Sequence, residues 1–261
     1  MKKTLLDTLP ADLPPSLCRL AAGARIFDSS CSPEARVYYI ERDEGYYLKC
    51  AACGTLAREA QMTAYFHKKG MGAHVLDYVT DSRDWLLTAR VAGEDCTHER
   101  YLADPVRLCD TLALALRALH ESDHTDCPVQ DRTASYLALA RENYQKGRFD
   151  TSLFSPIIPF PSAEHAYRTL CEGLDALGCD TLLHGDYCLP NIMLNNWHLS
   201  GFIDVGNGGV GDRHIDLFWG VWTLHFNLKT TKYKDRFLDA YGRDRADEAL
   251  LRVVAAAEVF G

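Results

Sequence analysis

Two short motifs in the last third of the chain constrain its fold more than any other feature. The first, LLHGDYCLPNIML at residues 182–194, ends a hydrophobic run in Asp186 and places Asn191 five positions later. The second, FIDVG at residues 202–206, brings Asp204 to the end of another apolar run. Between them, NIML and LSGFID predict two strands joined by NNWH. The sequence therefore predicts a polar loop, a hairpin and a second carboxylate in close succession.

Length and composition indicate a globular chain. Its 261 residues can form one large domain or two small lobes, and a hydrophobic content of 47% is sufficient for a core. No apolar run approaches the roughly 20 residues that a membrane span requires. The segment 1–17 is a poor signal peptide because polar residues and prolines break its apolar pieces. We therefore expect a cytoplasmic protein.

The cysteines and the net charge limit which disulfides, metal sites and binding partners we expect. The ten cysteines are irregularly spaced, which favours reduced thiols over a disulfide framework. Cys50 and Cys53 form a C-x-x-C, but no second such pair or histidine pair completes a zinc set, so buried thiols are favoured over metal or redox chemistry. The net charge of -8 disfavours nucleic acid and anionic membranes and favours cationic partners. The alternative is that this acidic balance serves solubility alone.

The N-terminal third predicts a small antiparallel sheet with one helix. The aromatic and β-branched runs ARVYYIE and YYLKCA, separated by RDEG, indicate a hairpin. The stretch TLAREAQMTAYFHKK follows Gly54 with apolar residues at helical spacing, and Gly70 marks the end of this helix. Two further strands are expected in VLDYVTDSRDWLLTARV.

Beyond this sheet the pattern becomes helical. PVRLCDTLALALRALHE and RTASYLALARENYQK predict amphipathic helices, PIIPFPS interrupts them, and the C-terminal segment is helical again. We therefore expect a two-lobed α+β fold. Residues 1–91 would form a nucleotide-binding lobe, AGED a connector, and residues 92–261 a mostly helical catalytic and substrate-binding lobe.

The order of these parts is typical of a phosphoryl-transfer enzyme. Asp186 can orient a substrate hydroxyl and accept its proton, while Asn191 and Asp204 offer the hard oxygen ligands that Mg²⁺ prefers. Lys49, at the end of its strand, can neutralise phosphate charge. Glu59, ten residues later on the helix, can pair with Lys49 and fix its direction.

The motifs HGDYCLPN and FIDVGNGGVGDRHID resemble those of the aminoglycoside 3'-phosphotransferases, kinase-like enzymes of antibiotic resistance. The resemblance covers nearly the whole chain and implies a protein-kinase-like fold. It implies that Asp186 is the catalytic base and that Asn191 and Asp204 are magnesium ligands. It also implies an ion pair between Lys49 and Glu59 in the nucleotide lobe.

The same resemblance implies further contacts with ATP or GTP. SSCSPEARVY lies where the family has its phosphate-positioning loop, so Ser32 would touch the β-phosphate. This loop lacks the G-x-G-x-x-G of eukaryotic protein kinases. Backbone groups of Ala89 and Val91, in LLTARVAGED, would hold the adenine.

Other residues in these motifs are expected to have structural roles. We expect His184 to be structural, and Gly185 and Gly206 to permit the backbone geometry of tight turns. Asp216 is expected to anchor the catalytic loop by accepting backbone hydrogen bonds. The aromatic run LFWGVWTLHF at residues 217–226 favours core packing over a substrate-stacking wall.

Several positions depart from the family pattern. Asn207 replaces a common arginine, Phe226 and Asn227 stand where carboxylates are expected, and the chain ends in AEVFG with Gly261 added. The carboxylates that remain as candidates for binding a cationic substrate are Glu94, Asp95 and Glu258.

The expected function is transfer of the γ-phosphate of a nucleoside triphosphate to a hydroxyl of an aminoglycoside, with Mg²⁺ as cofactor. The alternatives are a kinase of another small hydroxylated molecule and a catalytically silent kinase-fold binding module. The intact set of Lys49, Asp186, Asn191 and Asp204 favours an enzyme, because a silent module has no chemical need for all four.

Overall fold

The computed structural model describes residues 3–6, 10, 12–150 and 156–261, so the expectation for the segment 1–17 lies partly outside the described residues. The chain divides into two compact units. Unit 1 comprises Met1–Asp95, Met193–Asn196 and Ser200–Gly206, and unit 2 comprises Cys96–Ile192, Trp197–Leu199 and Asn207–Gly261. The functions expected for residues 1–91 and 92–261 stay predictions.

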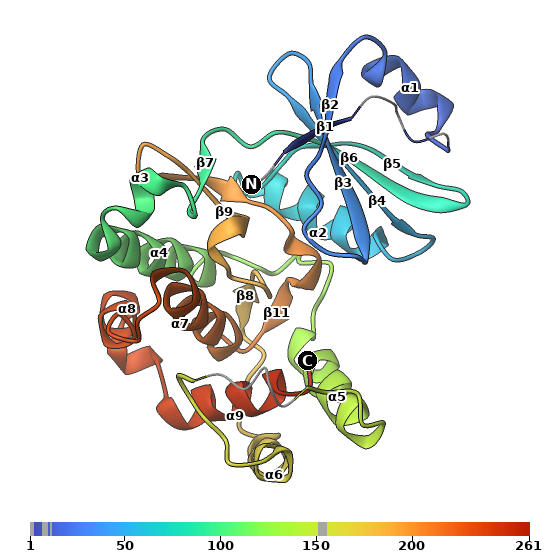
Figure 1. Cartoon of the computed structure of the whole chain (residues 1–261). Coiled ribbons are helices and arrows are strands. Elements are labelled where there is room, and N and C mark those ends of the chain that lie inside the picture. Colours follow the sequence, from blue (N-terminus) through green and yellow to red (C-terminus); the bar gives the residue numbers. More distant parts are fainter. Residues whose placement is uncertain (1–2, 7–9, 11, 151–155) are drawn as a thin grey trace. The chain divides into compact units, whose positions relative to one another are not determined.

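Unit 1 is built on a six-stranded antiparallel sheet in the order β1-β2-β3-β4-β6-β5 (Figure 1). Its strands are β1 (Thr4–Leu6), β2 (Arg25–Asp28), β3 (Ala35–Glu41), β4 (Tyr46–Ala52), β5 (Val75–Thr80) and β6 (Arg83–Ala89). The predicted hairpin is β3–β4, with Ile40 opposite Tyr46 across the turn. The predictions of β5 and β6 are confirmed as well.

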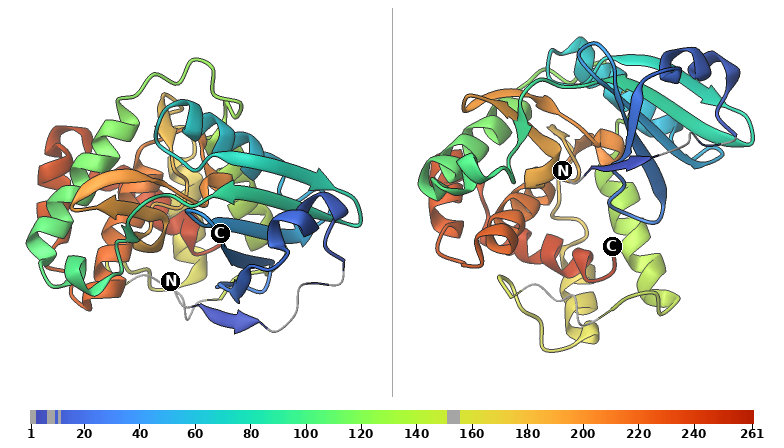
Figure 2. Two further views of the ribbon diagram at one scale, coloured as in Figure 1. Left: turned by 90° about the horizontal axis from the view of Figure 1, so that it is seen from above. Right: turned by 45° about the horizontal axis from the view of Figure 1, so that its top comes forward.

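Two helices cover opposite faces of this sheet, α1 (Pro15–Ala21) and α2 (Ala57–Lys68) (Figures 1 and 2). Successive side chains of a strand point to opposite faces, so Leu48 and Cys50 pack in the cluster that contains α1, whereas Ala51 packs in the cluster with α2. Lys49 alternates with Leu48 and Cys50 and therefore points to the side of α2. The sequence predicts α2 but misses α1.

A buried carboxylate fixes the beginning of α2. Asp84 of β6 has no exposed surface, and its Oδ2 accepts a hydrogen bond from the backbone nitrogen of Leu56 at 2.8 Å. Burial opposes ionisation of Asp84, but hydrogen bonds from the backbone of Gly54 and Leu56, together with those from the Tyr78 and Thr80 side chains, outweigh it and lower the pKa of this carboxyl. The anchored start of α2 sets the position of Glu59 in the first turn of the helix.

A second, three-stranded sheet has the order β10-β9-β7. It consists of β7 (Glu94–Asp95), β9 (Ile192–Asn195) and β10 (His198–Phe202), and β9–β10 is the hairpin that the sequence predicts. Gly93 has φ +90°, and a Cβ at this position would clash with the carbonyl oxygen of Leu194. Only glycine permits β7 to approach β9 so closely.

Unit 2 is mainly helical. Its helices are α3 (Glu99–Leu102), α4 (Pro105–His120), α5 (Arg132–Gln145), α6 (Ala163–Gly173), α7 (His214–Leu228), α8 (Lys234–Tyr241) and α9 (Glu248–Glu258). Two short strands, β8 (Thr181–Leu183) and β11 (Gly209–Gly211), form an antiparallel pair. Single 3₁₀ turns occur at Leu189–Asn191, Val205–Asn207 and Arg243–Arg245. Among the described residues, no helix is long and apolar enough to cross a membrane.

The predicted helix α4 forms the centre of unit 2. Leu108, Leu112, Leu116 and Leu119 recur at helical spacing and are completely buried. Asp104 caps the helix by accepting a hydrogen bond from the nitrogen of Arg107 at 3.1 Å. The prediction of α5 is also confirmed.

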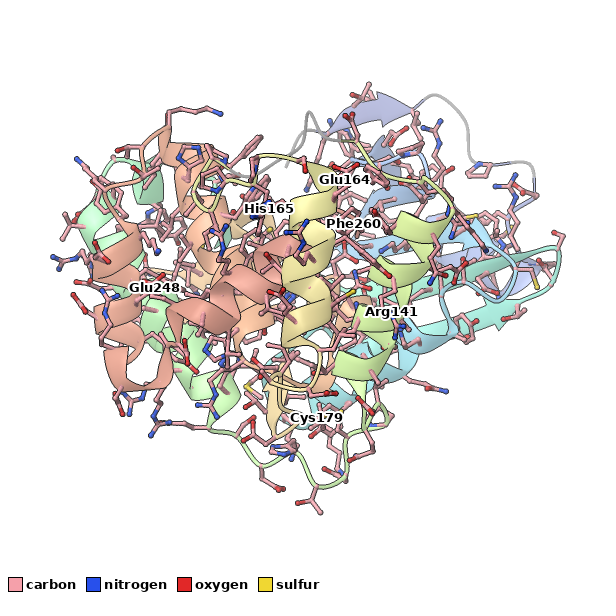
Figure 3. The ribbon with its side chains drawn as sticks, turned by 90° about the horizontal axis from the view of Figure 1, so that it is seen from below. Arg141, Glu164, His165, Cys179, Glu248 and Phe260 are labelled. Carbon is pink, nitrogen blue, oxygen red and sulfur yellow. The ribbon has the colours of Figure 1, made fainter. Side chains whose placement is uncertain are left out.

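Aromatic rings anchor the end of α9 against α5 and α6 (Figure 3). The Phe260 ring lies edge-on to Tyr144 and Tyr167, at centroid distances of 5.3 and 6.0 Å. Tyr144 and Tyr167 stack on each other at 3.7 Å. Asn143 donates to the carbonyl oxygen of Phe260 at 2.6 Å. These contacts hold the last turn of α9, which carries Glu258.

We expect Phe260→Ala to lower the free energy of unfolding by about 3–5 kcal/mol, because it deletes the ring of a residue that is only 1% exposed. The matched control is Phe226→Ala, since Phe226 is 52% exposed and its truncation should cost much less. Urea unfolding monitored by circular dichroism measures both changes. Equal losses of stability would contradict the anchoring role of Phe260.

Candidate active site

The loop that carries Asp186 begins at the end of the buried strand β8. Gly185 has φ +81°, and a Cβ at this position would clash with the carbonyl oxygen of Asn207. A side chain is therefore excluded by both conformation and space, which confirms the role expected for Gly185. The tight turn projects Asp186 away from the core, and its side chain is half-buried.

Asp216, in the first turn of α7, holds this loop in place. Its Oδ2 accepts a hydrogen bond from the backbone nitrogen of His184 at 2.7 Å, and its Oδ1 accepts one from Gly185 at 2.8 Å. The Asp216 side chain is completely buried. These bonds to an anion in the first turn of a helix are favourable in charge and geometry. The expected anchoring role of Asp216 is confirmed.

His120 of α4 supports the same carboxylate. Its Nε2 lies 3.2 Å from Oδ2 of Asp216, and its Nδ1 lies 2.8 Å from the hydroxyl of Tyr241. Burial lowers the pKa of His120 more than the Asp216 charge raises it, so the ring is neutral. The contacts place the proton on Nε2, which donates to Asp216, while Nδ1 accepts from Tyr241.

Asp186 is oriented by two neighbours on its own loop. The amide nitrogen of Asn191 donates to Oδ2 of Asp186 at 2.9 Å and to its carbonyl oxygen at 3.0 Å. Nδ1 of the buried His184 accepts from the Asp186 backbone nitrogen at 3.2 Å. His184 thus shapes the turn, as expected. Because the nitrogen of Asn191 faces Asp186, its amide oxygen is the atom that can serve as a metal ligand.

Sequence reasoning missed Cys188, which also contacts Asp186. Its thiol hydrogen-bonds the Asp186 carboxylate, and burial together with this carboxylate raises the pKa of Cys188 far above its ordinary value. The thiol therefore stays protonated and acts as a donor. Thr223 of α7 accepts a hydrogen bond from the backbone nitrogen of Leu189 at 3.0 Å, which ties the loop to α7. The only sequence signal for Cys188 is its place two residues after Asp186.

Of the carboxylates predicted to bind the substrate, Glu258 is the one that lies in unit 2. Its Oε1 accepts a hydrogen bond from the Tyr136 hydroxyl at 2.8 Å, and Trp219 is a second donor. Burial raises the pKa of Glu258 to about 7, and the Asp186 charge acts in the same direction. The carboxylates of Glu258 and Asp186 are therefore electrostatically coupled.

Unit 1 brings together Lys49, Glu59 and Asp204. The Lys49 ammonium lies 2.8 and 2.9 Å from the two oxygens of Glu59 and 2.9 Å from Oδ1 of Asp204. Burial lowers the pKa of Lys49, but Asp204 and Glu59 more than compensate, so the net shift is upward. Burial, and then Asp204, raise the pKa of Glu59 against the influence of Lys49. Lys49 is thus a firmly charged ammonium group.

The segment after Asp204 packs on the first turn of α2. Asp204 has φ +57°, which is uncommon for a residue other than glycine, and half of its side chain is exposed. Nε of Arg58 donates to the carbonyl oxygen of Gly206 at 2.7 Å. A Cβ on Gly206 would lie 3.1 Å from the Cβ of Glu59. Gly206 therefore serves a close approach, without the positive φ that was expected.

The predicted nucleotide contacts lie at separate places in the six-stranded sheet, one between β2 and β3 and the others at and after the end of β6. Ser32 is exposed in the β2–β3 turn, where its hydroxyl hydrogen-bonds Glu34 and lowers the pKa of that carboxyl. Ala89 ends β6, and its nitrogen already donates to the carbonyl oxygen of His74 at 2.9 Å. Ala89 would therefore have to contact adenine through its carbonyl oxygen. Val91 follows and is half-buried.

The remaining candidate carboxylates lie in β7. Glu94 is half-buried opposite Leu194, and Asp95 is only 6% exposed opposite Met193. Their roles toward a substrate stay predictions. All ten cysteines lie in described segments and none of them forms a disulfide, with Cys50 buried and Cys53 exposed. No group of three or more His, Cys, Asp or Glu suited to a metal ion occurs within the described ranges.

A charged lysine held by a helix glutamate, and a loop aspartate held by an asparagine, are parts of a kinase-like phosphotransferase. Residues 33–252 match the model of the phosphotransferase enzyme family, and the chain belongs to that family. It is an enzyme of the kinase type, as the sequence predicts.

The chain is 49% identical over 249 residues to a probable aminoglycoside 3'-phosphotransferase of Lactococcus lactis subsp. lactis, a match that covers 95% of each sequence. The crystal structure of an aminoglycoside-3'-phosphotransferase of type VIII is similar, with a TM-score of 0.72 and 25% identity over 92% of this chain and 94% of that one. A Streptomyces rimosus aminoglycoside phosphotransferase in complex with ADP and streptomycin shares the fold, with a TM-score of 0.68 and 21% identity over 87% and 91% of the chains. The predicted family and fold class are confirmed.

We expect Asp216→Asn to lower the free energy of unfolding by about 2–4 kcal/mol, because an amide cannot accept as strongly from both backbone donors. Asp235→Asn is the matched control, since Asp235 also lies in a first helical turn but its side chain is 79% exposed. Urea unfolding compares the two variants. A similar small loss of stability in both variants would show that Asp216 does not anchor the loop.

The raised pKa of Glu258 predicts a pH dependence of stability. Between its ordinary value of 4.5 and about 7, Glu258 holds a proton in the folded state that it lacks when unfolded, so stability falls as pH rises through this window. Glu258→Gln should make that fall smaller, whereas Glu172→Gln at an exposed position should not. Unfolding free energies at pH 5, 6, 7 and 8 provide the measurement. Parallel curves for wild type and Glu258→Gln would contradict the prediction.

Proposed function

We propose that this enzyme transfers the γ-phosphate of ATP or GTP to a hydroxyl of an aminoglycoside. The observation that carries the proposal is the fixed orientation of the half-buried Asp186, which Asn191 holds on a loop anchored by Asp216. The name of the Lactococcus lactis relative supports the 3'-hydroxyl as the acceptor.

In this proposal Asp186 orients the acceptor hydroxyl and takes its proton as the oxygen attacks the phosphorus atom. A positioned base of this kind typically contributes a factor of 10² to 10⁴ in rate. Hydrogen bonds from Asn191 to the side chain of Asp186 and from Asp186 to His184 restrict the carboxylate before a substrate binds. The loop therefore needs little rearrangement during the reaction.

We assign Mg²⁺ to Asn191 and Asp204. The donor set fits a hard cation, since the Asn191 nitrogen is engaged by Asp186 and its amide oxygen remains as a ligand, while Asp204 offers a half-exposed carboxylate. When bound, Mg²⁺ neutralises charge on the phosphate oxygens. Lys49, kept protonated and directed by Glu59, orients the phosphates from unit 1.

The nucleotide would be held by the lobe predicted for residues 1–91. Ser32 would touch the β-phosphate, and the Ala89 carbonyl with a backbone group of Val91 would hold the base. The exposed position of Ser32 and the engaged nitrogen of Ala89 are compatible with these roles. Residues 92–261 would supply the catalytic loop and most of the acceptor site.

The acceptor would be a cationic molecule rather than nucleic acid or a membrane surface. The net charge of -8 supports this choice. Glu258 is the main candidate to pair with an ammonium group, and Glu94 and Asp95 are further candidates. A bound ammonium group would favour ionised Glu258 and so lower its pKa from about 7. Ten cysteine thiols outside disulfides support a reducing, cytoplasmic location.

A kinase of another small hydroxylated molecule is the second candidate. It is favoured by the exposed ring of Phe226 and the neutral amide of Asn227, where a strongly cationic acceptor would be better served by carboxylates. A silent binding module is disfavoured by the complete set of chemical groups.

Magnesium-dependent nucleotide consumption with a panel of aminoglycosides and uncharged alcohols tests the proposal. We expect turnover with aminoglycosides. If an uncharged or singly charged alcohol reacts while no aminoglycoside does at millimolar concentration, the aminoglycoside assignment is wrong and the kinase assignment stands.

We expect Asp186→Asn to lower kcat by about 10²-fold or more, because the amide cannot take a proton. Nucleotide affinity should change little. Asp175→Asn, at an exposed position, serves as the control. Steady-state kinetics and nucleotide titration separate the two effects, and a kcat within threefold of wild type would exclude Asp186 as the base.

Asp204→Asn should raise the magnesium concentration needed for half-maximal rate, because it removes an anionic ligand. High magnesium should partly restore the residual rate. Asp43→Asn, another exposed substitution in unit 1, should leave the magnesium dependence unaltered. An unchanged requirement in Asp204→Asn would show that Asp204 is not a ligand.

A further inference from the structure

The aromatic run of α7 is divided between two faces of the helix. Leu217, Phe218, Val221 and Leu224 are buried, as core packing predicts. Trp219, Trp222 and Phe226 follow one another at spacings of three and four residues and so lie on one side of the helix. Trp219 and Trp222 are half-buried, and Phe226 is 52% exposed. The expectation of core packing is therefore wrong for these three rings, which we call the aromatic face.

The rings of the aromatic face touch one another in sequence. Trp219 meets Trp222 edge to face at a centroid distance of 5.3 Å, and Trp222 stacks on Phe226 at 4.9 Å with an interplanar angle of 10°. The ammonium group of Lys229 lies 4.3 Å from the centre of the Phe226 ring. The outer end of the aromatic face thus already receives a cation, through the attraction between positive charge and the ring.

The inner end of the aromatic face reaches the catalytic loop. The indole of Trp219 hydrogen-bonds Glu258, whose carboxyl group is influenced by the charge of Asp186. One turn further, Thr223 accepts a hydrogen bond from Leu189 of the loop. The aromatic face therefore extends from the neighbourhood of the base toward the solvent-exposed Phe226.

The charges along this side of α7 are few. Glu258 provides a carboxylate at the inner end, and Lys229 provides an ammonium group at the outer end. Between them, the Asn227 amide donates to the carbonyl oxygen of Thr223 at 2.8 Å and carries no charge. Several ammonium groups could not all be paired with carboxylates here, and unpaired charges are costly to desolvate.

We propose that the aromatic face binds the acceptor, with one of its rings packed against Trp222 and Phe226. One ammonium group of the acceptor pairs with Glu258, and another takes the position over Phe226 that Lys229 occupies. This inference rests on the proposed function and specifies its substrate class, namely cyclic amino alcohols with few ammonium groups. Apolar contact and the attraction of cations to the rings replace part of the ion pairing.

Kinetics of Phe226 and Trp222 variants test the inference. Phe226→Ala and Trp222→Ala should raise the KM for an aminoglycoside about tenfold with kcat within twofold, because the lost contact is made equally in ground and transition states. The KM for nucleotide should not change. Phe226→Tyr keeps the aromatic ring, so its KM should stay near that of the wild type. Phe226→Leu keeps the apolar volume but not the ring, so its KM should rise almost as much as in Phe226→Ala.

Substitution of Lys229 should change the KM in the opposite direction to substitution of the rings. Lys229→Ala removes the internal competitor and should lower the KM for the same aminoglycoside about threefold. Lys232→Ala is the matched control, because its ammonium group lies over the ring of Tyr233, outside the aromatic face. A higher KM in Lys229→Ala, or equal changes in both variants, would overturn the displacement of Lys229.

The failures of the two proposals are distinguishable. If the wild type phosphorylates aminoglycosides and both alanine variants keep its KM, the aromatic face does not bind the acceptor and the proposed function stands. If no aminoglycoside is phosphorylated, the proposed function fails. Quenching of tryptophan fluorescence by an aminoglycoside, measured without nucleotide, then decides whether the aromatic face binds such molecules. Quenching in the wild type that is lost in Trp222→Phe supports binding at the aromatic face. No quenching in the wild type overturns the inference.

Discussion

The carboxylate of Asp216 is the constraint on which the loop that carries Asp186 depends. It is completely buried and accepts hydrogen bonds from the backbone of His184 and Gly185. A buried charge is tolerated only when such partners compensate its desolvation, and neutral His120 completes the set. The loop is therefore fixed at the two residues that precede Asp186. Hydrogen bonds from the Asn191 amide and the Cys188 thiol then set the direction of the Asp186 carboxylate.

The charged groups of the two units have different electrostatic surroundings. In unit 1, two carboxylates surround one lysine, so Lys49 keeps its proton and Asp204 keeps an exposed side available to a metal ion. In unit 2, burial and, to a smaller extent, the charge of Asp186 raise the pKa of Glu258 to about 7. A cation that binds beside Glu258 would restore its charge. The free enzyme thus carries little unpaired charge where we place the acceptor.

Local patterns in the sequence predict the parts that depend on local chemistry. The hairpins β3–β4 and β9–β10, the helices α2 and α4, and the anchoring role of Asp216 follow from alternation, helical spacing and motif order. Contacts between distant segments that lie outside these motifs could not be predicted, because no local spacing encodes them. Asp84 capping α2 across 28 residues is one such contact. The division of the α7 rings is another, since burial of Phe218 and exposure of Phe226 depend on which side the neighbouring helices cover.

The central claim is phosphoryl transfer to one hydroxyl of an aminoglycoside. ³¹P NMR and mass spectrometry of the reaction product test it most directly. The enzyme, ATP and Mg²⁺ are incubated with an aminoglycoside that has a 3'-hydroxyl and, separately, with its 3'-deoxy counterpart. We predict a single new phosphomonoester on the first compound and none on the second. Release of inorganic phosphate without any phosphorylated aminoglycoside, or equal phosphorylation of both compounds, would contradict this claim.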